Sequence, residues 1–154
     1  MFTTIILGAG KSTRMKANKS KLLFNIAGKP VINHIVESVK GARSRNITCV
    51  INSQSKDLKK ILIGSKIEVV VQKQLDGTAG AVKSALATKK PGNSTILILC
   101  GDTPFIKDSS IKKIVNKLKS SEACIGTVEL DIPKGYGRII RTKNNISRII
   151  EEKE

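Results

Sequence analysis

This chain of 154 residues has few of the side chains on which several classes of site depend. It has no tryptophan, one tyrosine and three phenylalanines, so it offers little aromatic surface for stacking on nucleic-acid bases. Its one histidine, His34, lies within a predicted helix, and no Ser-His-Asp or Cys-His arrangement can be built around it. No apolar run is long enough to span a membrane. The composition therefore disfavours triad hydrolases, base-stacking proteins and membrane proteins.

The cysteines are also few, and their positions do not suggest a disulfide framework. Cys49, Cys100 and Cys124 are odd in number and far apart, and each lies in a predicted strand, which favours buried thiols over a disulfide or a metal cluster. The first strand lacks the basic start and the small-residue cleavage site of a signal peptide. We therefore expect a cytoplasmic protein.

The chain has many positive charges, with a formal net charge of +16. The lysines are spread from Lys11 to Lys153 without a dense run, and aromatic residues are scarce among them. Diffuse charge of this kind predicts nonspecific attraction to anions rather than recognition of a sequence. We therefore expect no specific nucleic-acid partner and no membrane partner.

Strands and helices are predicted to alternate along most of the chain. This alternation predicts an α/β domain over residues 1–154, with a mainly parallel sheet and helices on both faces. The last third is predicted to contain strands only. The predicted strands are 3–7, 47–51, 67–71, 95–100, 124–130, 137–142 and 146–151. Four helices are predicted: one from Pro30 at its first position to Gly41, one through 58–62, one over 78–88, and one from a capping Asp108 through Leu118.

A glycine-rich loop with cationic residues follows the first strand. Gly8 and Gly10 let backbone N–H groups approach an anion, while Lys11 and Arg14 add charge suited to phosphate. A P-loop is excluded because its first glycine would have to stand at Ile5, inside the strand.

A dinucleotide fingerprint fits the same loop poorly. It needs a third glycine where Thr13 stands and an acidic residue after the strand 47–51, which is followed by Asn52 and Ser53. The remaining scheme is a glycine loop followed by Arg-Met and a lysine, here Lys21. The loop therefore predicts a nucleotide site of this third type.

Three polar segments follow parallel strands of the predicted sheet. They are residues 8–14, 72–78 and 101–104, and ligands of open α/β sheets bind at that edge. Asp102 follows a buried strand directly, so it is either a turn former before Pro104 or a hard oxygen ligand for Mg²⁺. The phosphate-type loop on the same edge favours the metal.

These motifs resemble the sugar-phosphate nucleotidyltransferases. The resemblance is carried by the glycine loop, Arg14-Met15, Lys21 and Gly28-Lys29-Pro30, with Ser12 and Ser20 where glycine and proline are usual. Further segments sharpen it to the uridylyltransferase domain of the bifunctional UDP-N-acetylglucosamine pyrophosphorylases, a branch of the MobA-like NTP transferases. These segments are Gln72 with Gly77-Thr78, residues 100–104, Gly135-Tyr136-Gly137-Arg138-Ile139 and residues 150–153; Gly80-Ala81 replaces the usual Gly-His.

The resemblance implies a role for each matching residue. Arg14 and Lys21 would meet phosphates as catalytic cations, Gln72 would contact uracil with Gly77 and Thr78, and Asp102 would bind Mg²⁺. Gly137 and Glu151 would face the amino sugar. The full set of implied nucleotide contacts is Leu7, Gly8, Ala9, Gly10, Lys21, Gln72, Gly77, Thr78, Cys100, Gly101 and Asp102. Taken singly, each has an ordinary reading as a solvated charge, a helix cap or a strand end.

The implied reaction transfers UMP from UTP to N-acetylglucosamine 1-phosphate for cell-wall precursor synthesis. The sugar phosphate is already an anionic nucleophile, so the lack of a general base is expected. The family domain and its left-handed β-helix acetyltransferase extend beyond the segment matched here. We therefore expect a fragment, half of a split enzyme or a remnant, whose exposed last strand favours a homo-oligomer or a complementing chain. A noncatalytic nucleotide-binding module and an enzyme for another sugar phosphate remain alternatives.

Overall fold

The structure is a computed structural model that describes residues 1–10, 19–88, 92–118, 121–143 and 145–152. The chain divides into two units, Met1–Cys124 and Ile125–Glu154, and each is described by itself.

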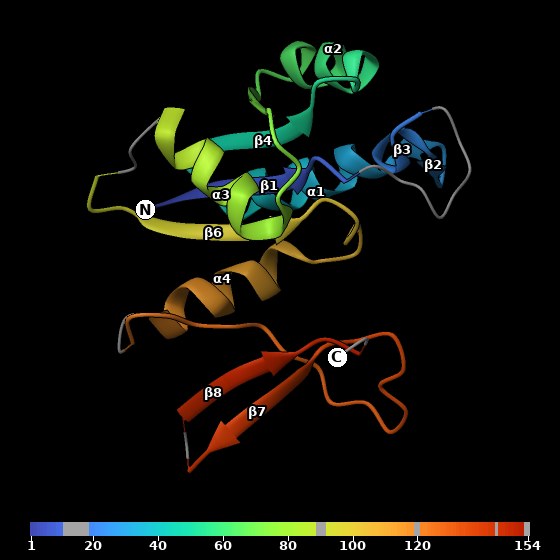
Figure 1. Cartoon of the computed structure of the whole chain (residues 1–154). Helices are drawn as coiled ribbons and strands as arrows, with labels where there is room; N and C mark the ends of the chain where they lie inside the picture. The colour runs from blue at the N-terminus through green and yellow to red at the C-terminus, as the bar shows by residue number, and fades with distance from the viewer. Residues whose placement is uncertain (11–18, 89–91, 119–120, 144, 153–154) are drawn as a thin grey trace. The chain divides into compact units, whose positions relative to one another are not determined.

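A parallel sheet forms the centre of the first unit (Figure 1). It consists of β1 (Phe2–Gly8), β4 (Asn46–Asn52), β5 (Glu68–Gln72) and β6 (Thr95–Cys100), in the order β5-β4-β1-β6. All three pairings are parallel. A parallel sheet is covered on both faces, so its strands are continuous apolar runs. Here β-branched residues and leucine supply these runs. The predicted parallel α/β architecture is confirmed.

Four helices cover the two faces of this sheet. The buried residues of α1 (Val31–Gly41), α2 (Lys56–Gly64) and α4 (Asp108–Lys117) pack in one core cluster, whereas those of α3 (Gly77–Thr88) pack in another. Successive residues of β1 serve the two clusters, with Ile6 in the first and Ile5 in the second, because side chains alternate along a strand. The second cluster contains Ala81 and Ala85 of α3, whose small side chains let the helix approach the sheet closely.

Two helix starts differ from the prediction. Pro30 immediately precedes α1, which begins at Val31, one residue later than expected. Asp108 was expected to cap α4, but Lys107 is the capping residue and Asp108 is the first residue of the helix. Its carboxylate instead accepts a hydrogen bond of 2.7 Å from Lys112, one turn later, and this bond lowers the pKa of Asp108. The pairing is the usual one for opposite charges four residues apart on a helix.

A short connection precedes α1 in the chain. It contains the 3₁₀ helix η2 (Lys21–Leu23) and a two-stranded hairpin made of β2 (Asn25–Ile26) and β3 (Lys29–Pro30). The hairpin turn needs a positive φ at both central residues, Ala27 and Gly28.

The second unit contains one hairpin. Strands β7 (Arg138–Thr142) and β8 (Asn145–Ile150) pair antiparallel, as the sequence predicted within one residue. The strand expected over residues 124–130 is wrong, because these residues have no regular secondary structure. No residue among 125–143 and 145–152 is buried.

The cysteines correct another expectation. Cys49 is buried in β4, and burial raises the pKa of its thiol to about 12. Cys100 and Cys124, by contrast, are exposed, and Cys124 lies outside any strand. Only Cys49 therefore is a buried strand thiol.

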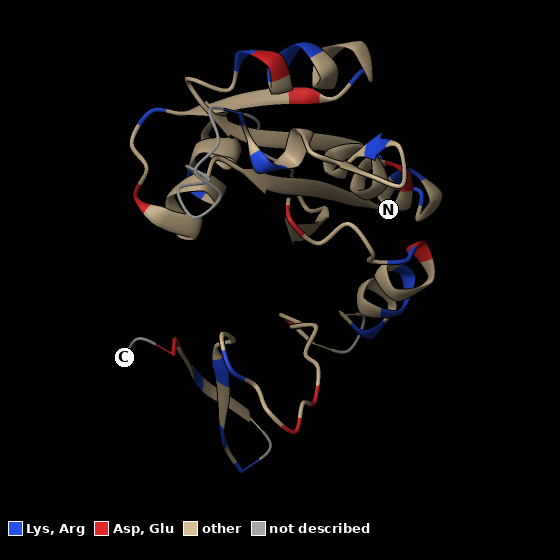
Figure 2. Cartoon of the chain, turned by 90° about the vertical axis from the view of Figure 1, so that its right-hand side faces the viewer, with Lys and Arg blue, Asp and Glu red and all other residues tan. Residues whose placement is uncertain are grey.

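Two surface features of the described residues bear on function. Lys and Arg lie on helices and loops of the first unit and on strands of the second, so positive charge is widely spread (Figure 2). Among the same residues, no helix combines the length and the apolar character needed to cross a membrane.

Candidate nucleotide site

A cavity opens at the carboxyl edge of the parallel sheet. Its volume is about 530 Å³, and its lining comes from the ends of β1, β5 and β6 and from the start of α3. The sheet order places β1 between β4 and β6, where successive crossovers run in opposite directions, and ligands of open α/β sheets bind at such a point. The lining residues are Leu7, Gly8, Ala9, Gly10, Lys21, Gln72, Leu75, Gly77, Thr78, Ala81, Cys100 and Asp102.

Most of the predicted nucleotide contacts meet in this cavity. Ten of the eleven predicted residues line it, and Gly101 alone does not. Gly101 is buried, and its N–H donates to the carbonyl of the lining residue Leu7 at 2.9 Å. Arg14 lies outside the described residues, so its role stays a prediction.

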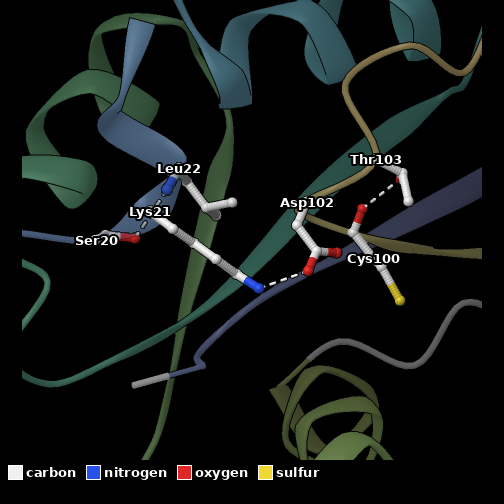
Figure 3. A network of polar contacts seen from close by, with 6 residues as sticks. All are labelled: Ser20, Lys21, Leu22, Cys100, Asp102 and Thr103. Carbon is white, nitrogen blue, oxygen red and sulfur yellow. Dashed lines mark hydrogen bonds and ion pairs between the residues drawn. The ribbon is translucent and has the colours of Figure 1, made fainter. Parts of the chain in front are cut away.

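Lys21 and Asp102 form an ion pair at the cavity (Figure 3). The ammonium of Lys21 donates to the carboxylate of Asp102 at 2.5 Å, across 81 positions of sequence. The side chains are 37% and 50% exposed, so water screens the pair and its contribution to stability is small. Both groups are therefore accessible to a charged ligand at little energetic cost.

The position of Lys21 depends on its neighbour Leu22. The Leu22 side chain is 1% exposed and belongs to the main core cluster. A Cβ on Gly8 would lie 2.9 Å from the Leu22 Cδ1 atom, and a Cβ on Gly101 would lie 3.0 Å from it. Because the two glycines have no Cβ atom, the Leu22 side chain has room beside them. The buried leucine in turn holds the adjoining Lys21 at the cavity.

The turn after β6 is held by local hydrogen bonds. The Thr103 hydroxyl donates to the carbonyl of Cys100 at 2.7 Å (Figure 3). Partial burial, and then the negative charge of Asp102, raise the pKa of the Cys100 thiol. Cys100 is therefore an exposed but poorly ionised thiol on the cavity wall.

The side chain of Gln72 closes another part of the cavity. It is 3% exposed, and its amide nitrogen donates to the Asp76 carboxylate at 2.7 Å and to the Gly77 carbonyl at 3.3 Å. Gly77 itself has a φ of +88°, which favours glycine at the start of α3.

The two predicted sugar contacts lie in the second unit. A Cβ on Gly137 would lie 3.5 Å from the Oε1 atom of Glu151, so the two residues are close to each other. The loop before Gly137 is held by Glu152, which accepts the N–H of Gly135 at 2.6 Å and pairs with Arg138 at 3.8 Å.

Sequence reasoning missed several residues of this arrangement. Leu75 and Ala81 line the cavity; each is three residues from a predicted contact, a spacing that places Ala81 on the same helix face as Thr78. Asn52 was used only to disfavour a dinucleotide, yet its amide donates to the carbonyl of Ala9 at 3.2 Å and ties the glycine loop to β4. No sequence pattern signals that bond, since it joins residues 43 positions apart.

Comparison with known proteins assigns the chain to a family. Residues 4–134 match the MobA-like NTP transferase domain. The chain belongs to this family. The MobA-like NTP transferases are the family predicted from the glycine loop, Lys21 and residues 100–104, and that prediction is confirmed.

Curated relatives of this NTP transferase include the bifunctional protein GlmU of Buchnera aphidicola subsp. Acyrthosiphon pisum. The two are 38% identical over 151 residues, which are 97% of this chain and 32% of the relative. The resemblance to the bifunctional enzymes is thereby confirmed. The chain spans about a third of the length of the curated relatives that it matches.

Solved structures share the fold of this NTP transferase. A Bacillus anthracis protein named as a glucose-1-phosphate thymidylyltransferase, solved with sucrose, has a TM-score of 0.77 at 22% identity, covering 100% of this chain and 66% of that one. The Mycobacterium tuberculosis protein Rv0371c, in complex with manganese, has a TM-score of 0.61 at 19% identity, covering 75% of this chain and 58% of that one.

Proposed function

We propose that the chain supplies the nucleotide site of a Mg²⁺-dependent uridylyltransferase. The reaction joins UTP and N-acetylglucosamine 1-phosphate to give UDP-N-acetylglucosamine and pyrophosphate, a cytoplasmic step in cell-wall precursor synthesis. The observation that carries the proposal is the cavity at the carboxyl edge of the sheet, with Lys21 and Asp102 paired on its wall. The relationship to GlmU supports the choice of UTP and of the amino-sugar phosphate.

The donor chemistry of Asp102 fits a divalent cation. Its carboxylate is a hard oxygen ligand, it is half exposed at the cavity, and it already accepts one cation, the ammonium of Lys21. A magnesium site commonly uses only one or two carboxylates, with substrate phosphates and water as the other ligands. Mg²⁺, when bound, would neutralise charge on the phosphates. Asp102 would hold it, and Lys21 would then be released toward the triphosphate.

The reaction needs alignment and charge neutralisation rather than a base. The phosphate of the sugar is an anion at neutral pH and attacks the α-phosphorus of UTP, and pyrophosphate leaves with the electrons of the broken P–O bond. Backbone of the glycine loop and Lys21 would hold the triphosphate, Arg14 would meet the leaving pyrophosphate, and Gly137 and Glu151 would position the sugar. Each of these groups acts on charge or position, and none has to move a proton.

Pyrophosphate release tests this function. The chain is mixed with UTP, Mg²⁺ and N-acetylglucosamine 1-phosphate, beside matched mixtures with CTP, GTP, dTTP or glucose 1-phosphate. The expected result is release that depends on UTP and on the amino-sugar phosphate. Calorimetric binding of UTP without turnover would instead support the noncatalytic nucleotide-binding module, and turnover of glucose 1-phosphate would support an enzyme for another sugar phosphate.

Substitution Asp102→Asn tests the metal assignment. We expect it to remove the Mg²⁺-dependent gain in UTP affinity, a loss of about tenfold or more, because a neutral amide is a poor ligand for Mg²⁺. Asp57→Asn is the matched control, since Asp57 is an exposed residue of α2. UTP titrations at several Mg²⁺ concentrations measure the effect. An Asp102→Asn protein with the parent's Mg²⁺ dependence would return Asp102 to the role of a turn former.

A further inference from the structure

One acidic residue that is hydrogen-bonded to the cavity residue Gln72 depends on a glycine one turn later. Asp76 immediately precedes α3, and its carboxylate occupies the space beside Gly80. A Cβ built on Gly80 would lie 1.7 Å from the Oδ1 atom of Asp76 and 2.5 Å from its Oδ2 atom. Any side chain at position 80 would therefore displace the carboxylate from its present place.

The carboxylate of Asp76 also determines how the Gln72 amide is oriented. The amide nitrogen of Gln72 donates to the Oδ1 atom of Asp76 at 2.7 Å and to the Gly77 carbonyl at 3.3 Å. Both partners are acceptors, so a reversed amide would put its oxygen against two other oxygens. Both N–H groups of the Gln72 amide therefore donate within the protein, and the amide oxygen is the group left to accept from a ligand in the cavity.

The orientation of that amide matters for reading a base. Uracil offers an N3–H donor, whereas cytosine has an unprotonated N3 acceptor at the same position of the ring. If the Gln72 amide is held in one orientation, its oxygen accepts a hydrogen bond from the N3–H of uracil. The same oxygen would face the N3 acceptor of cytosine, and two acceptors repel each other. An amide free to turn would instead satisfy either base, because its nitrogen would donate to cytosine N3.

We propose that Asp76 is a positioning residue for base selection, which holds Gln72 as an acceptor and which requires glycine at position 80. The proposal rests on the proposed uridylyltransferase function and adds to it the residues that set the preference for UTP over CTP. Asp76 does not touch the nucleotide in this scheme. It acts through Gln72, so its removal relaxes discrimination more than it weakens UTP binding.

Calorimetric titration of the full chain with UTP and with CTP, in the presence of Mg²⁺, tests the proposal. Asp76→Ala is expected to reduce the ratio of the CTP and UTP dissociation constants by about tenfold, while the UTP constant itself changes by less than about threefold. Asp76→Asn keeps an acceptor oxygen and is expected to keep most of the preference. Asp57→Ala, an exposed substitution on α2, is the matched control and leaves the ratio unchanged.

Gly80→Ala provides a second route to the same effect. Alanine favours a helix over glycine, so this protein is expected to fold at least as well as the parent. Its added methyl group displaces Asp76, so the preference for UTP falls even though the carboxylate is still present. The double variant Asp76→Ala with Gly80→Ala is expected to be no worse than either single variant, because both changes break one contact.

The Gln72 amide can also be observed without any nucleotide. In ¹⁵N-labelled protein, its side-chain NH₂ signals are identified by their loss in Gln72→Leu. Asp76→Ala and Gly80→Ala are expected to shift these signals and to speed their exchange with water several-fold, whereas Asp57→Ala leaves them unchanged. Signals that are the same in all of the proteins would overturn the proposal, whatever the nucleotide preference.

The binding results separate this proposal from the function on which it rests. A parent protein that prefers UTP, with variants that prefer it equally, overturns the role of Asp76 and leaves the uridylyltransferase function standing. A parent protein that binds UTP and CTP equally contradicts the uridylyl assignment, and base selection by Asp76 with it.

Discussion

The two units of the chain differ in what holds their functional residues in place. In Met1–Cys124 the candidate nucleotide contacts stand on a parallel sheet whose faces are covered by two clusters of buried side chains. In Ile125–Glu154 the candidate sugar contacts stand on a two-stranded hairpin with no buried residue among those described. A two-stranded hairpin alone is only marginally stable in water. The candidate contacts to the base and phosphates thus have a buried core beneath them, and the candidate contacts to the sugar do not.

The largest effect should come from opening the core of the first unit. Ile6 is fully buried at the centre of β1, so Ile6→Ala is expected to lower the free energy of unfolding by about 2–5 kcal/mol. The matched substitution in the hairpin, Ile149→Ala, removes a side chain that is 49% exposed and should cost less than about 1 kcal/mol. Urea denaturation measures both. Equal losses would mean that the hairpin is as well supported as the sheet.

A smaller effect is expected from Gly101→Ala, which adds a methyl group beside the candidate nucleotide site. The new Cβ would lie 2.7 Å from the Leu7 carbonyl oxygen, a backbone atom that cannot move aside freely. We expect a loss of about 1–3 kcal/mol in unfolding free energy and weaker UTP binding.

The control for Gly101→Ala is Gly64→Ala in α2. A Cβ there meets nothing within 4 Å, so its stability should be unchanged or slightly higher. Urea denaturation and UTP calorimetry report the two effects, and a stable Gly101→Ala protein with parental affinity would show that the turn after β6 can yield.

The smallest effect is expected in the second unit, from Glu152→Ala. This change removes the acceptor of the Gly135 N–H and the carboxylate that pairs with Arg138. We expect hydrogen exchange at the Gly135 amide to become about fivefold to tenfold faster, which corresponds to the loss of one hydrogen bond worth about 1 kcal/mol. The urea transition should stay in place. Glu129→Ala, an exposed change in the same unit, is the control, and equal exchange in both variants would exclude a role for Glu152 in holding the loop.

The sheet and its helices could be predicted because their signals are local. Apolar runs predicted each strand of the parallel sheet, and helical spacing predicted the helices; all four strands formed. Residues 124–130 contain apolar residues of strand type, but a strand also needs a neighbour for its hydrogen bonds, and among the described residues these pair with none. Propensity alone cannot supply that information.

The candidate site was predictable only as far as strand ends determine it. Loops after parallel strands meet at one edge, which is why Gly10, Gln72 and Asp102 could be grouped from the sequence alone. The ion pair of Lys21 with Asp102 and the tie from Asn52 to the glycine loop join residues far apart in sequence, so no spacing rule reveals them. The exposure of Cys100 was missed for a similar reason, because it depends on what covers the end of β6.

The space filled by Leu22 limits which substitutions this site can accept during evolution. Gly8, Gly101 and Leu22 share one space, so a larger residue at Gly8 needs a smaller residue at position 22. A larger residue at Gly101 also meets the carbonyl oxygen of Leu7, and a smaller residue at position 22 does not remove that contact. Among descendants of this chain, we therefore expect changes at Gly8 and Leu22 to occur together, and Gly101 to be kept.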